Sequence, residues 1–197
     1  FVSGKGRYTD DIQLVGLTYA AFVRSPYARA DIKSFDVSDA LAAPGVIAVL
    51  TGEEVAKDGL GGLPCGWMIH SKDGSEMRQP HHPVLAADRV NYLGEPVALV
   101  IADTQLEAKN AAELVMVDFE PLTAVVNPAT ASQAETLYEA VPNNLCYEWE
   151  LGDEAATEAG LAAAAHVTTL KLTNNRLIPN AIEPRAALAE YNSGTDE

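Results

Sequence analysis

The hydrophobic positions between residues 88 and 122 form one pattern that predicts a complete packing unit. Val97 to Ile101 is an unbroken apolar run, which is typical of a strand covered on both faces. Gly94-Glu95-Pro96 precedes this run as a turn signal, because Gly permits positive φ and Pro fixes its own φ. The unit is expected to read strand, turn, buried strand, helix and strand, and it carries almost no side chain suited to chemistry.

The helix of this unit is predicted from its cap and its apolar stripe. Thr104 and Glu107 have the spacing of a capping box, in which each side chain satisfies an otherwise unpaired helix N–H. Small apolar residues follow at helical spacing: Ala108, Ala111, Ala112 and Val115. Small side chains let a helix lie close to a sheet, so the clearest pattern in the chain is architectural.

The residues before this unit predict shorter elements. An irregular lead-in is expected over residues 1–16, followed by strands over 17–24, 30–37 and 46–50. Ser38 is the expected N-cap of a short helix over 38–43. Thr51, with Glu54 three residues later, is the expected cap of another helix that ends at Val55.

Residues 57–86 lack this periodicity. They hold five of the fourteen glycines and three prolines, which predicts a long surface loop or irregular excursion. A loop of this length is often functional or an interface element. If this one is, Trp67 and Met68 are the apolar anchors expected to contact a partner.

The last third of the chain changes composition. Residues 123–142 are rich in Ala, Thr and Val and predict a linker along a surface. A helix is expected over 153–165, then strands over 166–173 and 185–191, with Asn192-Ser193-Gly194 as a hairpin turn. Only three residues follow that turn, so we expect the chain to be a piece of a longer polypeptide. No apolar run approaches the roughly 20 residues that a membrane helix needs.

Charge and cysteine usage exclude several functions. The formal charge is -15, from 28 acidic against 13 basic residues, which argues against a nucleic-acid or anionic membrane partner and indicates solubility. Cys65 and Cys146 form no C-x-x-C motif, so neither a metal site nor a redox pair is expected. A disulfide between them stays open, and a reducing cytoplasm is the simpler inference.

Other candidate residues favour structural roles. Gly4-Lys5-Gly6 lacks the context of a phosphate loop, and residues 59–62 do not match a dinucleotide-binding motif. No serine lies in the G-x-S-x-G context of a hydrolase nucleophile, which disfavours a small hydrolase. The remaining candidates are expected on a solvated loop (His70, His81, His82), in packing or capping (His166) and in a turn salt bridge (Arg7, Asp10, Asp11).

Glu183-Pro184-Arg185 places opposite charges close together at the start of a predicted strand. If Arg185 begins a central strand, Glu183 enters the interior and needs a partner there. The favoured interpretation is a buried structural ion pair, and the alternative is a catalytic acid.

Six motifs in order carry a resemblance to one family. They are GRYTDDI (6–12), RSPYARADI (24–32), PGVIAVLTGEEV (44–55), GEPVALVIAD (94–103), VDFEPL (117–122) and NRLIPNAIEPRAALAEY (175–191). Together they resemble the N-terminal part of the large subunit of molybdenum hydroxylases, the relatives of xanthine dehydrogenase, aldehyde oxidase and aerobic carbon monoxide dehydrogenase. The I-E-P-R form near residue 182 is similar to the bacterial branch with separate subunits.

The resemblance implies a mixed α/β (α+β) fold with stated domain limits. Residues 1–14 would be a lead-in segment, 15–125 an α/β hammerhead domain, 126–150 a linker and 151–197 the incomplete start of the molybdopterin-binding domain. The implied partners are an FAD subunit, a small subunit with two [2Fe–2S] clusters, and the rest of the large subunit. A dimer of such heterotrimers in the cytoplasm is expected.

The resemblance also implies an oxidative hydroxylation. In the family, a glutamate base activates a molybdenum-bound hydroxyl, hydride passes to a sulfido group, and electrons leave through iron–sulfur clusters to FAD. The cofactor is molybdopterin, here expected as the cytosine dinucleotide. The family's functional motifs lie after the part that this chain matches, so no residue is expected to be catalytic, cofactor-binding or metal-binding. The rival hypothesis is a free-standing, non-enzymatic α/β binding or assembly module.

Overall fold

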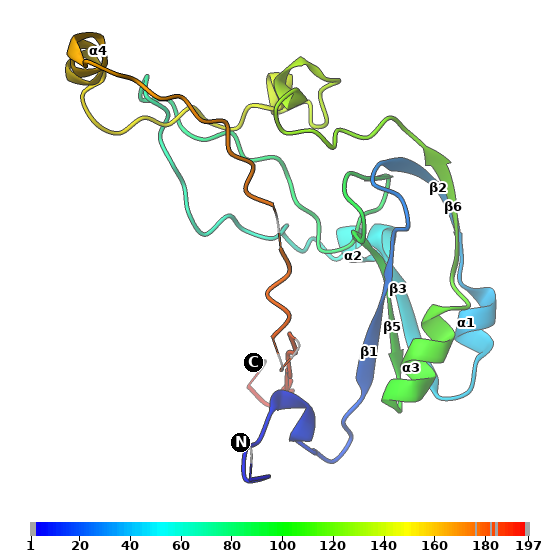
Figure 1. The fold of residues 1–197 in the computed structure, drawn as a ribbon. Coiled ribbons are helices and arrows are strands. Elements are labelled where there is room, and N and C mark those ends of the chain that lie inside the picture. The colour runs from blue at the N-terminus through cyan, green and yellow to red at the C-terminus, as the bar shows by residue number, and fades with distance from the viewer. Residues whose placement is uncertain (1–2, 176, 182, 184, 196–197) are drawn as a thin grey trace. The chain divides into compact units, whose positions relative to one another are not determined.

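The structure is a computed structural model that describes residues 3–175, 177–181, 183 and 185–195 (Figure 1). It contains two compact units: residues 18–152, and residues 1–17 together with residues 153–197. The domain limits that the resemblance implies stay a prediction.

Two three-stranded antiparallel sheets form the larger unit, one ordered β1-β5-β3 and the other β4-β2-β6 (Figure 1). The strands are β1 (Tyr19–Arg24), β2 (Ala30–Asp36), β3 (Val46–Thr51), β4 (Arg89–Val90), β5 (Pro96–Ala102) and β6 (Met116–Pro121). Strands and helices mix along the chain, so the predicted α/β (α+β) fold class is confirmed.

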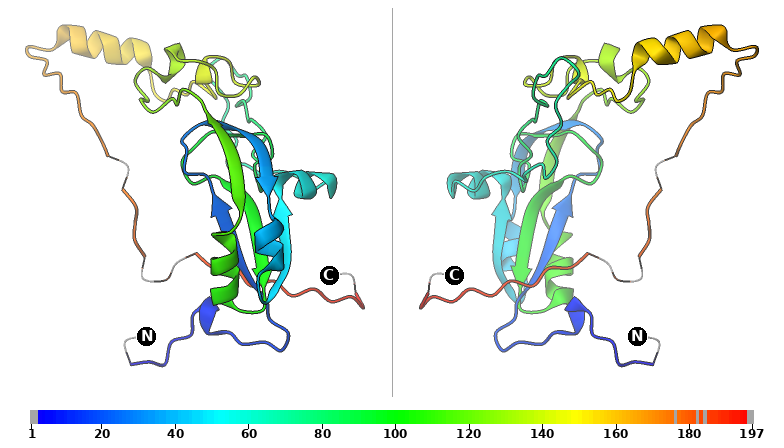
Figure 2. Two further views of the ribbon diagram at one scale, coloured as in Figure 1. Left: turned by 90° about the vertical axis from the view of Figure 1, so that its right-hand side faces the viewer. Right: turned by 90° about the vertical axis from the view of Figure 1, so that its left-hand side faces the viewer.

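β5 is the centre of the first sheet, as its apolar sequence predicts. β1 and β3 pair with its two edges. Val97 and Val100 are fully buried, because Val97 packs into a core cluster with Ala30 and Val90, and Val100 into another with the helix residues Ala40 and Ala111. Helices α1 (Ser38–Ala42) and α3 (Gln105–Ala112) lie side by side against this sheet (Figure 2). Ala40 and Ala111 bring their small side chains into its core, which allows the close approach of both helices.

The predicted caps of two helices are present, with one change of partner. At α3, the Thr104 Oγ accepts the Glu107 N–H at 3.2 Å. The Glu107 carboxylate accepts the Thr104 hydroxyl at 2.7 Å, where a backbone N–H was expected. At α2 (Gly52–Lys57), the Glu54 carboxylate accepts the Thr51 N–H at 2.8 Å, as the capping box predicts.

The predicted cap of α1 is wrong. The N-cap is Val37, and the Asp36 carboxylate accepts the Ser38 N–H at 3.0 Å. A carboxylate makes a stronger, charge-assisted bond than a hydroxyl, so Asp36 takes the role expected of Ser38.

The long loop predicted before β4 is present and is partly ordered by hydrogen bonds. Residues 69–78 fold back on themselves in a hairpin-like loop held by backbone hydrogen bonds, which we call the loop finger. Residues 145–148 run along it, and the Lys72 N–H donates to the Glu148 carbonyl at 2.8 Å. Loop and linker therefore hold each other within the larger unit.

The smaller unit contains the 3-10 turn η1 (Thr9–Asp11) and helix α4 (Glu154–Ala163). Asp153 caps α4, because its carboxylate accepts the Ala156 N–H at 2.9 Å. The strands predicted over 166–173 and 185–191 are wrong: their described residues are exposed and have no strand to pair with. The predicted turn is present, with the Thr195 N–H donating to the Asn192 carbonyl at 3.2 Å, but the described residues beside it form no strand.

No helix in the described part of the chain is both long and apolar enough to cross a membrane.

Candidate functional site

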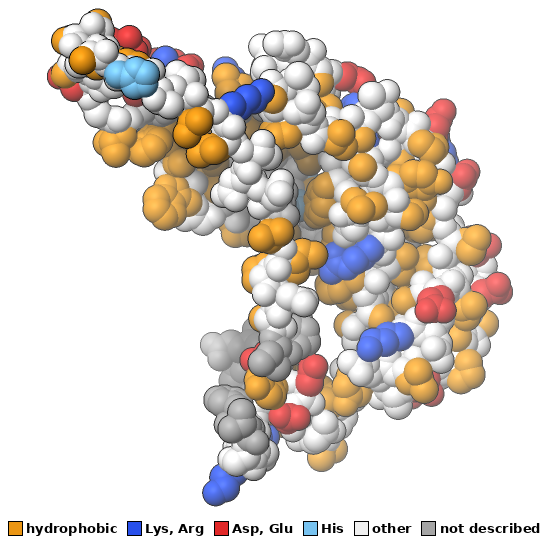
Figure 3. All heavy atoms as spheres, viewed as in Figure 1, with side chains coloured by type: hydrophobic (Ala, Val, Ile, Leu, Met, Phe, Trp, Pro, Cys, Tyr) orange, Lys and Arg blue, Asp and Glu red, His pale blue; other side chains and the backbone are white. Residues whose placement is uncertain are grey.

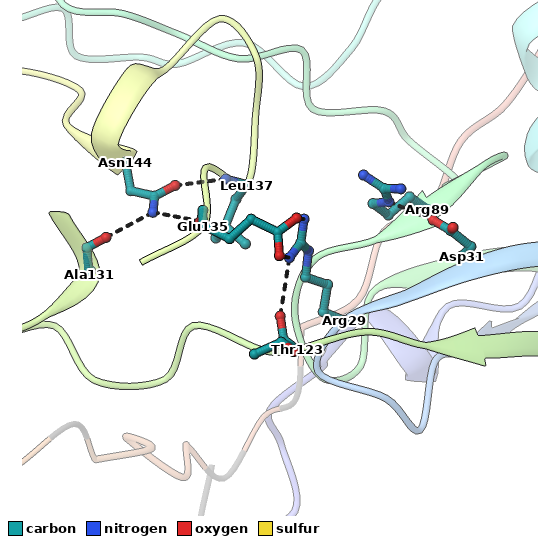
Figure 4. Close-up of polar contacts among 8 residues, drawn as sticks. All are labelled: Arg29, Asp31, Arg89, Thr123, Ala131, Glu135, Leu137 and Asn144. Atoms are coloured by element: carbon teal, nitrogen blue, oxygen red, sulfur yellow. Dashed lines mark hydrogen bonds and ion pairs between the residues drawn. The ribbon is translucent and has the colours of Figure 1, made fainter. Parts of the chain in front are cut away.

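The candidate site lies on the polar face of the second sheet, where the linker covers the ends of β2 and β4 (Figure 4). Asp31 on β2 pairs with Arg89 on β4. Arg29 directly precedes β2 and Asn91 directly follows β4, so both lie at the same end of this antiparallel strand pair. Arg29 is the buried charged group at this end of the sheet.

Arg29 connects the sheet to the linker. Its side chain is only 2% exposed, and its guanidinium donates to the Thr123 carbonyl at 3.1 Å and pairs with Glu135 at 3.0 Å. The bond from Arg29 lowers the pKa of the Glu135 carboxyl, and the positive charge of Arg29 lowers it further. Within the described residues, the buried Nε of Arg29 has no hydrogen-bond partner. A buried guanidinium needs its acceptors, so this contact fixes the linker on the sheet.

The linker is shaped by Asn144 (Figure 4). The Asn144 side chain donates to the Ala131 carbonyl at 2.8 Å and to the Glu135 carbonyl at 3.0 Å, and it accepts the Leu137 N–H at 2.8 Å. Its backbone has a φ of 54°, which Asn tolerates better than most residues. Residues 131–144 therefore form a loop closed by the hydrogen bonds of Asn144, which we call the linker loop.

Outside the linker loop the polar face carries exposed charges. Arg89 donates to Asp31 at 2.6 Å, and this bond lowers the pKa of the Asp31 carboxyl and raises the pKa of Arg89. Lys33 pairs with Glu120 on β6, which raises the pKa of Lys33. These groups are solvent-exposed, so the pairs contribute little to stability and mainly set the local charge.

A buried carboxyl lies beneath the same end of β4. Glu95 is 3% exposed, and its carboxylate accepts the Asn91 N–H at 2.6 Å. Burial raises the pKa of Glu95, and the backbone N–H groups of Asn91 and Tyr92 work against that rise. The turn predicted at Gly94-Glu95-Pro96 is thus held from inside by the Glu95 side chain. Its role is structural in this fold.

A pocket of about 430 Å³ opens beside Asn91. One wall is apolar and comes from α2 and residues 83–87, and the other is polar and includes Asp88, Arg89, Asn91 and the linker-loop residue Tyr138. Burial raises the pKa of the Tyr138 hydroxyl, and the charge of Glu95 raises it further. Among the described residues, the buried Oδ1 of Asn91 has no hydrogen-bond partner. Asn91 and Tyr138 therefore meet on the polar wall of this pocket.

The sequence did not single out these residues. The alternation in A-R-A-D-I-K does place Arg29, Asp31 and Lys33 on one strand face, which is a signal for a charged surface. No local sequence pattern marks Asn91 or Tyr138 as a candidate site residue, because the linker loop brings Tyr138 to Asn91 only through tertiary contacts.

The histidines singled out in the sequence lie at the surface. His70, His81 and His82 are exposed, as expected, and His82 Nε2 lies 3.3 Å from the Tyr92 hydroxyl. His166 is exposed too, so its expected packing role is wrong; its ring bonds the Thr168 hydroxyl at 3.1 Å. The described residues contain no group of three or more His, Cys, Asp or Glu side chains placed to hold a metal ion.

The remaining sequence candidates differ from expectation in part. Cys65 and Cys146 are both free thiols, so no disulfide joins them. In the described structure, Asp11 accepts the Tyr8 N–H at 2.9 Å in place of the expected salt bridge to Arg7. Trp67 is 78% exposed, as an anchor for a partner would be (Figure 3 shows hydrophobic side chains exposed over one face).

Glu183 lies in the smaller unit, where it contacts the lead-in. Its carboxylate accepts the Thr9 N–H at 3.3 Å. This bond connects the sequence motif at residues 6–12 with the motif at residues 175–191. Glu183 and Arg185 are both exposed, and no ion pair links these two described residues. The predicted burial of the pair is therefore wrong, because the segment that carries it does not form the central strand on which burial depended.

These features define a hammerhead domain. The sequence matches the family described as "Aldehyde oxidase and xanthine dehydrogenase, a/b hammerhead domain" over residues 3–123, and the chain belongs to this family. It corresponds to the N-terminal hammerhead region of a molybdenum hydroxylase large subunit.

The similar proteins are considerably longer. The chain is 35% identical to the carbon monoxide dehydrogenase large chain of Afipia carboxidovorans over 197 residues, which is 93% of this chain and 23% of that one. Quinoline 2-oxidoreductase from Pseudomonas putida 86 superimposes with a TM-score of 0.61 at 36% identity, over 68% of this chain and 16% of that chain. Reconstituted CO dehydrogenase from Oligotropha carboxidovorans superimposes with a TM-score of 0.67 at 34% identity, over 84% of this chain and 21% of that chain.

Proposed function

We propose that this chain is the scaffold and subunit-contact region of a bacterial-type molybdenum hydroxylase large subunit. The whole enzyme would oxidatively hydroxylate an aldehyde, a purine or other N-heterocycle, or carbon monoxide. The family match over residues 3–123 is the observation that carries this proposal. The chain spans about a quarter of the relatives' length, so the activity belongs to the whole assembly.

The scaffold role rests on where the buried polar groups of the larger unit are used. The buried Arg29 and Glu95 and the half-buried Asn144 each hold a backbone segment in place through hydrogen bonds within the chain. A catalytic group instead needs access to a substrate or cofactor. We therefore assign no catalytic, cofactor-binding or metal-binding residue to this chain.

The cofactor of the assembly would be molybdopterin with molybdenum, as the cytosine dinucleotide. We expect the residues that hold it to come from the rest of the large subunit, outside the part that the family match covers. An FAD subunit and a small [2Fe–2S] subunit would be the partners, in a cytoplasmic dimer of heterotrimers. The loop over 57–86, with exposed Trp67 and Met68, is the proposed contact or channel element.

Metal analysis of the protein purified from its source with its neighbours tests this proposal. Molybdenum in stoichiometric amount, together with iron and flavin, is the expected result. An intact preparation in which this chain occurs alone, without molybdenum, would instead support the free-standing assembly module.

A further inference from the structure

The first sheet has one covered face and one open face. Helices α1 and α3 pack on the covered face, where Val49, Ala98 and Val100 are buried against them. In the right-hand view of Figure 2 the strands of this sheet lie in front of the helices, so the opposite face is seen. Side chains alternate along a strand, so the residues next to the buried ones point to that opposite face.

The strand register joins six side chains on this side of the sheet. They form two rows, Ala20–Ile101–Ala48 and Phe22–Leu99–Leu50, which we call the open face. Directly paired residues of antiparallel strands have Cβ atoms about 5 Å apart on the same face, so each row is a continuous apolar strip. None of the six is buried: Phe22 is 48% exposed, Ala20 is exposed, and the rest are half-buried.

The open face departs from the pattern of a solvated sheet. A sheet face in water normally carries polar side chains that alternate with the buried ones. β5 is instead apolar from 97 to 101, which is typical of a strand covered on both faces. On the open side the start of β5 is buried, because Val97 packs with Ala30 and Val90 of the second sheet, and the cover ends before Leu99. The sequence therefore suits a second cover that the larger unit does not supply.

The size of the open face favours a cover from the same polypeptide. A stable interface between separate proteins uses about 20–30 residues a side, and six side chains are far fewer. A covalently connected segment is already held near the face, so a small patch is enough to dock it. Relatives have such polypeptide, because the chain spans only 23% of the Afipia carboxidovorans carbon monoxide dehydrogenase large chain.

Given the proposed function, we propose that an apolar segment from beyond residue 197 of the same large subunit covers the open face. The covering side chains are uncharged, because the six side chains beneath them offer neither a charge nor a hydrogen bond. Arg24 borders the face, with its guanidinium 5.3 Å from the centroid of the Phe22 ring, so the segment carries no basic side chain at that edge. The loop over 57–86 then stays available for the partner subunits.

Photocrosslinking in the whole molybdenum-containing enzyme tests this cover. With p-benzoylphenylalanine in place of Phe22, mass spectrometry should find the probe joined to a large-subunit peptide from beyond residue 197. The mass of the crosslinked subunit should stay that of one copy. The same probe in place of Leu106, which is 68% exposed on α3, is the matched control and should not reach that peptide.

Several crosslinking results would overturn the cover. They are a crosslink to the flavin or iron–sulfur subunit, a crosslink within residues 1–197, a doubled subunit mass, and the absence of any crosslink at position 22. Molybdenum, iron and flavin measured in the same preparation test the proposed function separately, so a failed cover and a failed function give different results.

A charge on the open face provides a second test. Phe22→Asp in the whole enzyme should speed thermal inactivation at least about tenfold, because the cover would bury an unpaired carboxylate. Leu106→Asp places the same charge on α3 and should leave the inactivation rate almost unchanged. Equal rates for the two variants would contradict the cover. If Phe22→Asp prevents assembly of the enzyme, the crosslink from position 22 still decides the question.

Discussion

Gly45 lies directly against the carboxylate of Glu107. A Cβ at position 45 would stand 2.4 Å from the Glu107 Cδ, and the backbone of Gly45 has a φ of 73°. The Gly45 carbonyl also accepts the Asp103 N–H at 2.9 Å. The turn before β3 and the cap of α3 therefore depend on each other at this point.

Gly45→Ala should destabilise the chain. The left-handed backbone alone costs a non-glycine residue about 1–2 kcal/mol, and the added methyl group pushes Glu107 away from the Thr104 hydroxyl. Gly94→Ala is the matched control, because Gly94 has a φ of 82° and an added Cβ there would meet no atom within 4 Å. Urea unfolding should show a larger loss of unfolding free energy for Gly45→Ala, and equal losses would contradict the contact with Glu107.

Arg29→Lys should loosen the linker loop. Lysine keeps the charge but lacks the forked donors that reach both Thr123 and Glu135, so an acceptor loses its partner at a cost of about 1–3 kcal/mol. Limited proteolysis should then cleave within residues 123–145 faster than in the original chain. Arg89→Lys changes an exposed pair in the same way and should leave the cleavage rate almost unchanged.

Glu95→Gln should change the pH dependence of stability. Burial raises the folded-state pKa of Glu95, so the folded state holds more protons than the unfolded state, and stability falls as pH rises from the ordinary glutamate pKa to the folded one. Gln cannot ionise. Chemical unfolding between about pH 4 and pH 8 should show the variant gaining stability relative to the original chain as pH rises. If the difference in unfolding free energy between the variant and the original chain stays constant with pH, the pKa of Glu95 is not raised by folding.

The ion pair between Arg29 and Glu135 acts on stability in the opposite direction. Arg29 lowers the pKa of Glu135, so the stability from this contact is present above the unfolded pKa of the carboxyl and is lost as pH falls through the folded one. Comparing Glu95→Gln with Glu135→Gln separates the contributions of the two carboxyls. The difference in unfolding free energy between variant and original chain should rise with pH for Glu95→Gln and fall with pH for Glu135→Gln.

Trp67→Ala should weaken assembly without weakening the chain itself. Trp67 is 78% exposed, so its removal leaves the core intact and should change the unfolding free energy by less than about 0.5 kcal/mol. In the purified complex, flavin and iron retained with the large subunit should fall. Leu106→Ala, an exposed site on α3, is the control, and equal retention in both variants would argue against the loop as a contact.

Local sequence accounts for most of the larger unit. The apolar run over 97–101 predicted the central strand, and the spacing of Thr104 and Glu107 predicted the start of α3. Those features depend on interactions within a few residues. The strands predicted over 166–173 and 185–191 failed for the opposite reason, because a strand needs a partner that its own pattern does not supply.

By itself the sequence determined the fold class, the buried strand, the capped helices and the resemblance to molybdenum hydroxylase large subunits. Only the tertiary structure decided that Arg29 and Asn91 lie at the same end of the β2–β4 pair, and that the linker loop brings Glu135 to Arg29 and Tyr138 to Asn91. The reason is physical: periodicity and caps are local, whereas the partner of a buried polar group is set by segments about a hundred residues away.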